Sequence, residues 1–303
     1  MKRKIVLNGP STLTVSLPAK WAKSNNIKKG DEVHVTDENN MLKISVQENF
    51  ESNKKTQVDV SGLSHAMTKS IIDMIHKSGY DEIEVFFDNA ETVRILSERI
   101  QSTLIGYEIV EQSSKSCVIK SISNIQKGEF ENLLRRVFRV TLSLAEGVLE
   151  TVKNKDFTNI NESLILEKTN NRLTNYCERI LNKQSYKDEK TVYLFHVLWL
   201  LESIGDDYRN MIKFMGGLKN VEVNKEIIKN IELVNGLLKM YYELFYKYNH
   251  QDMDVFRQKY KEVLKNLDNS AIRKDTDISI NNHLHSITNR IYDCLGSTTG
   301  LHA

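Results

Sequence analysis

The sequence predicts a mainly α-helical protein that begins with a β-rich part. Apolar and polar residues alternate over residues 1–47, which is the period of a half-buried strand. From Gly128 onward, apolar residues recur every three or four positions, which is the period of a helix. The only prolines are Pro10 and Pro18, so nothing after them prevents long unbroken helices. We therefore expect three domains, at residues 1–48, 55–123 and 128–297.

The composition is that of an ordinary globular protein. Hydrophobic residues make up 40% of the 303 residues and charged residues 27%. The net charge of +2 is too small to indicate nucleic-acid binding by itself. Cys117, Cys177 and Cys294 lie far apart and predict neither a zinc site nor a disulfide framework, which fits a reducing cytosol. The longest apolar run, Tyr193 to Leu201, is too short to span a bilayer, so we expect a cytoplasmic protein.

The first 47 residues predict short strands around one helical turn. Gly9-Pro10-Ser11 is a turn signal, Pro18 starts the helical turn, and Asn39-Asn40 turns the last strand back. Seven basic residues precede the first acidic residue, Asp31: Lys2, Arg3, Lys4, Lys20, Lys23, Lys28 and Lys29. Such a block is typical of binding to a phosphate backbone, although a solvated basic surface explains it equally well. The segment is too short for a comfortable core of its own, which favours a dimer that shares its strands.

The same segment resembles the SpoVT-AbrB DNA-binding domain. The resemblance is carried by Lys4-Ile5-Val6, Gly9, Thr12-Leu13-Thr14-Val15-Ser16-Leu17-Pro18, Trp21-Ala22 and Ile27-Lys28-Lys29-Gly30-Asp31-Glu32-Val33. It implies a swapped-hairpin β dimer that places basic residues against duplex DNA. The DNA contacts that we expect are Lys2, Arg3, Lys4, Lys20 and Lys23.

After a polar linker at Phe50 to Lys55, the residues up to 123 predict a small α+β domain. Ser64 can cap a helix that ends at Ser78-Gly79 and turns Met67, Ile71, Ile72 and Ile75 inward. Strands are expected near residues 57–60, 82–87, 107–112 and 117–122, with a second helix from Asp88 or Asn89 to Leu104. No catalytic or phosphate-binding motif is present, so a spacer, a dimerisation element and a sensor all stay open. His65 and His76 are expected on the surface.

Six helices are predicted in the remainder of the chain. Their expected bounds are about 129–153, 161–183, 189–216, 223–248, 253–267 and 279–295. Two sets of three helices in similar order suggest an internal duplication.

The third of these helices carries the clearest constellation of polar residues. Glu202, Asp206 and Asn210 are spaced four apart and therefore share one helix face. Two carboxylates at this spacing repel each other, and a hard cation could offset that cost. Gly205 costs about 1 kcal/mol of helix propensity, which suggests close approach of another helix or of a ligand. The alternative is a solvated face, because Glu-x-x-x-Asp is common by chance.

The segment Leu201-Glu202-Ser203-Ile204-Gly205-Asp206, with Asn210, resembles the Glu-Arg-Ile-Gly-Asp segment of the PhoU family of phosphate-signalling regulators. Ser203 departs from that pattern, which often has Arg there. The resemblance implies two tandem three-helix bundles and a multivalent metal ion, such as iron, zinc or magnesium, at the first repeat. Its ligands would be Glu167, Asn171, Glu202, Asp206 and Asn210. The second repeat offers only His285, Asn289 and Asp293, so a second metal site is doubtful.

These resemblances together predict a DNA-binding negative regulator of phosphate uptake that is not an enzyme. The expected partners are duplex DNA, a second copy of the chain, and a phosphate ABC transporter or a sensor kinase. The alternative is a metal-binding helical scaffold whose β domain serves only for dimerisation. Metal-dependent catalysis is a weak third option, because no nucleophile or general base can be named.

Overall fold

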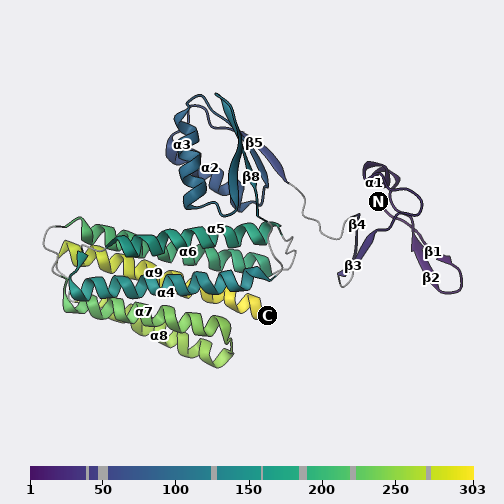
Figure 1. The fold of residues 1–303 in the computed structure, drawn as a ribbon. Helices are drawn as coiled ribbons and strands as arrows, with labels where there is room; N and C mark the ends of the chain where they lie inside the picture. The colour runs from purple at the N-terminus through teal and green to yellow at the C-terminus, as the bar shows by residue number, and fades with distance from the viewer. Residues whose placement is uncertain are drawn as a thin grey trace. The chain divides into compact units, whose positions relative to one another are not determined.

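The structure is a computed structural model that describes residues 1–38, 41–46, 54–123, 128–157, 160–183, 190–218, 223–270 and 274–303. The chain forms two compact units, Met1–Ser52 and Asn53–Ala303. The fold class is as predicted, mainly helical with a small β part at the N-terminus (Figure 1). The predicted turn at Asn39-Asn40 and most of the predicted linker at Phe50 to Lys55 lie outside the described residues.

The N-terminal unit consists of two separate hairpins and one short helix. Strands β1 (Ile5–Asn8) and β2 (Thr12–Val15) pair antiparallel, with Ile5 opposite Val15. The chain turns between them at Gly9, whose φ of +74° is a conformation that glycine adopts without strain. Helix α1 (Ala19–Ser24) follows Pro18, and strands β3 (His34–Glu38) and β4 (Met41–Ser45) form the second hairpin.

The second unit begins with a four-stranded sheet covered on one side by two helices (Figure 1). The strands lie in the order β5 (Lys55–Asp59), β6 (Glu82–Phe86), β8 (Ser116–Ser121) and β7 (Tyr107–Gln112). Strands β5 and β6 are parallel and are joined by α2 (His65–Lys77), whereas the other pairs are antiparallel. Helix α3 (Glu91–Ser102) connects β6 to β7. Ser64 caps α2 as predicted, because its hydroxyl accepts the N–H of Met67 at 3.3 Å.

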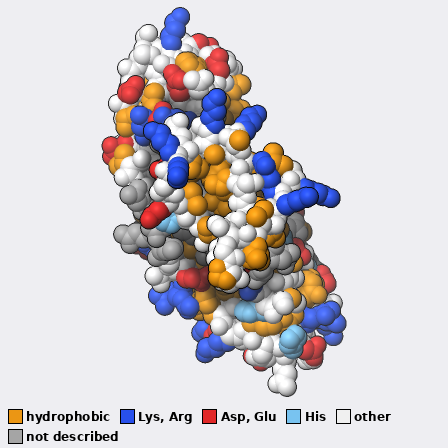
Figure 2. Space-filling model, turned by 90° about the vertical axis from the view of Figure 1, so that its right-hand side faces the viewer, with side chains coloured by type: hydrophobic (Ala, Val, Ile, Leu, Met, Phe, Trp, Pro, Cys, Tyr) orange, Lys and Arg blue, Asp and Glu red, His pale blue; other side chains and the backbone are white. Residues whose placement is uncertain are grey.

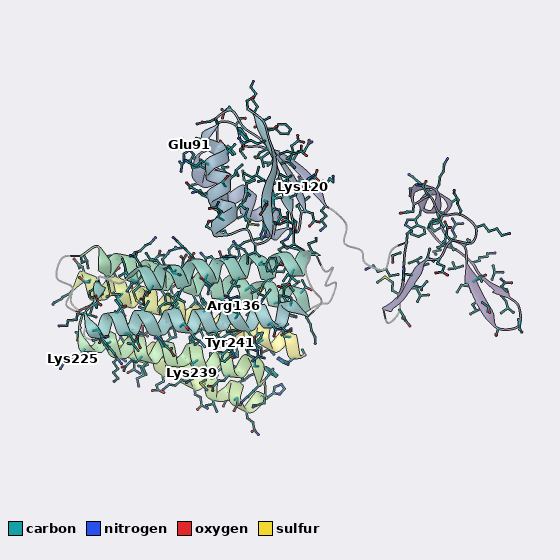
Figure 3. All side chains as sticks on the ribbon, in the orientation of Figure 1. Glu91, Lys120, Arg136, Lys225, Lys239 and Tyr241 are labelled. Carbon is teal, nitrogen blue, oxygen red and sulfur yellow. The ribbon has the colours of Figure 1, made fainter. Side chains whose placement is uncertain are left out.

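The rest of this unit is a bundle of long helices. They are α4 (Glu129–Asn154), α5 (Ile160–Lys183), α6 (Lys190–Gly216), α7 (Lys225–Tyr246), α8 (His250–Asp268) and α9 (Asp275–His302). Helices α4, α5 and α6 pack on one another, as do α7, α8 and α9, and the two sets meet through α6 with α9 and α4 with α7. One continuous hydrophobic core runs through both sets. Tyr241 lies in this core and bonds Thr298 at 2.9 Å (Figure 3).

The second half of α5 is buried on all sides. Each of residues 173–181 is buried, including the polar Asn175, Glu178 and Arg179. Helix α5 packs against α4 and α6 in the bundle and also against α2 of the α+β part. A helix with this pattern is enclosed by its neighbours, so α5 joins the two parts of the unit.

The structure overturns three sequence-based expectations. Helix α9 extends to His302, well past the predicted end near residue 295. Met67 does not face the core but is 52% exposed, because the buried face of α2 passes through Thr68 and Ile72 instead. His76 is not a surface residue: it is fully buried, since α2 turns it toward the loop after α3.

Candidate functional site: a basic β unit and an ion-pair network on the helices

All five basic residues predicted to contact DNA are exposed. Lys2, Arg3 and Lys4 precede β1, and Lys20 and Lys23 lie on α1. The unit therefore offers five cationic side chains to solvent. Binding of a polyanion is consistent with that charge, because each cation that meets a phosphate releases a condensed counterion.

The hairpins of the N-terminal unit leave their apolar side chains exposed to solvent. Every residue of β1 and β2 is exposed, with Ile5 and Leu13 each at 67%. The face of the molecule drawn in Figure 2 likewise carries hydrophobic side chains between Lys and Arg side chains. A hairpin of this kind is marginal alone in water and needs a partner surface.

Arg209 joins two of the carboxylates predicted to bind metal. Its guanidinium lies 2.6 Å from Glu167 Oε1 and 2.6 Å from Asp206 Oδ1. Asn171 also donates to Glu167 Oε1 at 2.8 Å, and Arg209 donates to the amide oxygen of Asn210 at 3.3 Å. Four of the five predicted ligands are thus gathered around one arginine, on α5 and α6.

Glu202, the fifth predicted ligand, turns toward the α+β part. Lys77, the last residue of α2, lies 3.2 Å from Glu202 Oε2 and 3.0 Å from Glu178 Oε2. Burial raises the pKa of both carboxyl groups, and the Lys77 ammonium opposes that rise. Burial by itself would lower the pKa of Lys77, but the two carboxylates hold that pKa above its ordinary value.

A second buried cation, Arg179, also links the α+β part to the helical bundle. Arg179 is 1% exposed and lies 2.7 Å from Asp81 Oδ1, which also pairs with Lys183 at 2.6 Å. The guanidinium also donates to the carbonyl oxygens of Tyr80 at 2.6 Å and His76 at 3.2 Å. Burial and the nearby Arg179 charge lower the pKa of His76 to about 3, so this imidazole is neutral.

The second set of helices keeps His285, Asn289 and Asp293 apart. His285 lies 3.6 Å from Asp268, and Asn289 accepts the hydroxyl of Tyr260 at 3.0 Å. Asp293 is exposed. His285 and Asn289 therefore belong to two separate contacts and Asp293 to neither, and a second metal site stays doubtful.

Asp207 forms the buried link between α6 and α9. It pairs with His283 at 3.1 Å and with Arg290 at 2.8 Å. The sequence motif singled out Asp206 and not its neighbour Asp207. The signal that it faces inward was its spacing, three residues after the buried Ile204 and four before the buried Met211.

The arrangement does not present a preformed metal centre. No three His, Cys, Asp or Glu side chains converge on a metal position within the described ranges. Glu167 and Asp206 share the single positive charge of Arg209, and Glu202 shares that of Lys77 with Glu178. A multivalent ion would have to displace these cations, and metal binding here stays a prediction.

Gly205 allows close approach of another helix, as its propensity cost suggested. A Cβ at this position would lie 3.4 Å from the side-chain amide carbon of Asn170 on α5. That amide donates to Thr141 on α4 at 2.6 Å. Gly205 therefore sits where three helices meet around a buried hydrogen bond.

Among the described residues, no helix combines the length and apolar character needed to cross a bilayer. The three cysteines are buried free thiols.

The N-terminal unit combines exposed hairpins with a basic surface. Residues 8–49 match the family described as antidote-toxin recognition MazE, bacterial antitoxin. This match supports a DNA-binding domain of the AbrB type and includes Lys20 and Lys23, while Lys2, Arg3 and Lys4 precede the matched residues. Comparison with curated proteins and with solved structures gave no match.

Proposed function

We propose that the chain is a DNA-binding regulator of phosphate uptake, in which two copies of the N-terminal unit hold duplex DNA. The observation that carries the proposal is the AbrB-type match at residues 8–49 on a unit whose basic side chains are exposed. Lys20 and Lys23 on α1 lie inside the match, and Lys2, Arg3 and Lys4 extend the same basic segment toward the N-terminus.

Dimerisation is supported by the apolar side chains that one copy leaves in water. Ile5, Leu7 and Leu13 are each at least 60% exposed, although strand residues of this type are normally half buried. Covering apolar surface yields about 25 cal/mol for each Å² removed from water. Pairing with a second copy would bury these side chains in a shared core.

The phosphate-specific role rests on the resemblance of the α6 segment, Leu201 to Asp206, to the PhoU family. Two sets of three packed helices, α4 to α6 and α7 to α9, are compatible with the tandem arrangement of that family. In this proposal the helical part reports phosphate status through contact with a phosphate transporter or a sensor kinase. The family matched by residues 8–49 is named for toxin recognition, and that role would replace phosphate signalling if this chain bound a toxin instead.

The competing proposal is a helical, metal-binding scaffold whose β unit only dimerises. Salt-dependent DNA binding distinguishes the two proposals, because a scaffold that does not bind DNA releases no counterions from it.

The test compares two double variants with a matched control. Arg3→Ala with Lys4→Ala, and Lys20→Ala with Lys23→Ala, each remove two exposed cations from the N-terminal unit. Lys225→Ala with Lys239→Ala removes two exposed cations from α7 and serves as the control (Figure 3). Affinity for duplex DNA is measured at several salt concentrations, with promoters of phosphate-transport genes and unrelated duplexes.

We expect each N-terminal double variant to flatten the slope of log K against log salt by about 0.9 for each lost phosphate contact, and the control to keep the wild-type slope. Equal slopes in all four proteins would remove these residues from the DNA interface. Binding to DNA without preference for phosphate-transport promoters would keep the DNA-binding role and reject the phosphate role.

A further inference from the structure

A cavity of about 520 Å³ opens in the α+β part, away from the bundle network. It lies at the carboxyl ends of the parallel strands β5 and β6, where Asp59 pairs with Phe86. Helices α2 and α3 both begin at this edge, and Glu91 in Figure 3 marks the start of α3. In α/β folds, ligands bind outside the carboxyl ends of parallel strands.

The start of α2 supplies hydrogen-bond donors to this cavity. Ser64 satisfies the amide of Met67, but the amides of His65 and Ala66 donate to nothing among the described residues. Free amides and the helix dipole at such a position favour an anion. His65 itself lines the cavity.

A buried hydroxyl points to a ligand independently of the helix start. Thr68 lines the cavity and is only 3% exposed. Its backbone N–H bonds Ser64, yet its hydroxyl bonds no other residue in the part of the chain that the structure describes. The side chain is therefore held in the wall of the cavity, and its hydroxyl is free to bond a molecule bound there.

The opposite wall carries an acceptor. Asp88 Oδ2 accepts the N–H of Gly62 at 3.1 Å, and Oδ1 accepts from no described residue. Asn89 uses its carbonyl oxygen for the N–H of Glu91 at 2.9 Å, which leaves its amide N–H groups as donors. A carboxylate would repel a bare anion, but it is a good partner for a hydroxyl group.

We propose that this cavity binds a small phosphorylated molecule that also carries hydroxyl groups, such as a nucleoside or sugar phosphate. The phosphate group lies against the start of α2 and accepts the Thr68 hydroxyl, while a ligand hydroxyl donates to Asp88. The cavity volume is within the range of about 300–1,000 Å³ that is usual for small-molecule sites, and inorganic phosphate alone would fill little of it.

The test uses the full-length protein and titration calorimetry with adenosine monophosphate, glucose 6-phosphate, adenosine, inorganic phosphate and citrate. The variants are Thr68→Val, which keeps the shape and removes the hydroxyl, and Asp88→Asn, which removes the charge on the exposed loop. Thr169→Val on α5 is the matched control, because its hydroxyl bonds the carbonyl of Ile165 away from the cavity. Circular dichroism confirms that each variant is folded.

We expect at least one phosphorylated compound to bind, with adenosine, phosphate and citrate each at least tenfold weaker. Thr68→Val and Asp88→Asn should each weaken binding about tenfold, and Thr169→Val should not change it. Absence of binding by both phosphorylated compounds would overturn the proposal, as would unchanged affinity in both cavity variants. Equal binding of inorganic phosphate or citrate would show recognition of an anion alone and would equally reject it. DNA binding plays no part in this test, so its outcome is independent of the proposed function.

Discussion

Lys77 and Glu202 form an ion pair at 3.2 Å although 125 residues separate them in the chain. Lys77 ends α2 of the α+β part, and Glu202 belongs to the α6 segment that resembles the PhoU motif. The same ammonium holds Glu178 at 3.0 Å. One lysine thus connects the α+β part to two helices of the bundle.

Replacing Lys77 should destabilise the second unit strongly. Glu178 is 3% exposed in its side chain, so Lys77→Met leaves a buried carboxylate without a partner. Breaking a buried pair in this way costs about 3–5 kcal/mol of unfolding free energy. The measurement is urea unfolding at pH 7.

Two further variants test whether the buried charge causes that loss of stability. Lys77→Met combined with Glu178→Gln should recover part of the stability, because the uncompensated charge is gone. Arg94→Met breaks only exposed pairs with Glu91 and Glu98 and should change the free energy of unfolding far less. Similar losses for Lys77→Met and Arg94→Met would show that the buried pair adds nothing.

His76 should make stability fall in acid. The pKa of this buried imidazole is lowered from 6.5 to about 3, so between these values the unfolded chain binds a proton that the folded chain does not. Stability then falls as pH falls, by up to about 1.4 kcal/mol per pH unit. Glu178 and Glu202, with raised pKa values, act in the opposite direction above 4.5.

The variant His76→Phe isolates this contribution, because phenylalanine can keep the edge contact with Tyr107. We expect the wild type to lose about 2 kcal/mol more than the variant between pH 7 and pH 5. Parallel pH profiles of the two proteins would mean that His76 takes up its proton without unfolding.

Any multivalent ion at the first helical set has to compete with Arg209. Removing that guanidinium in Arg209→Met frees Glu167 and Asp206. Added magnesium or zinc should then raise the melting temperature of the variant more than that of the wild type, because a ligand stabilises by RT ln(1 + [L]/Kd). Chelator should reverse the effect, and the exposed Arg257→Met on α8 should behave as wild type. If the added ion raised the melting temperature equally in all three proteins, it would bind somewhere other than at Glu167 and Asp206.

Gly205 and Gly236 should respond differently to the same substitution. A Cβ at Gly236 on α7 meets nothing within 4 Å, so Gly236→Ala should stabilise by up to about 1 kcal/mol. At Gly205 a larger side chain enters the space of Asn170, and Gly205→Val should cost about 1–3 kcal/mol more than Gly236→Val. Equal melting temperatures of the two valine variants would contradict the close approach of α5 and α6.

The sequence alone located most elements, because their signals are local. The apolar period predicted α4 to within one residue, Glu129–Asn154 against 129–153, and Ser64 was identified as the cap of α2. The common face of Glu202, Asp206 and Asn210 also follows from spacing within one helix. Helical spacing could also have identified Arg209, three residues after Asp206, as the ion-pair partner of Asp206.

Only the tertiary structure decided which of these residues meet. Nothing near Glu202 in the sequence indicates Lys77, and nothing near His76 indicates that α5 and the loop after α3 enclose it. Helical periodicity assigns a residue to a face but does not say which distant element covers that face. The burial of His76, the enclosed second half of α5 and the pairing of Glu202 with a lysine all depend on long-range packing, which a local pattern does not encode.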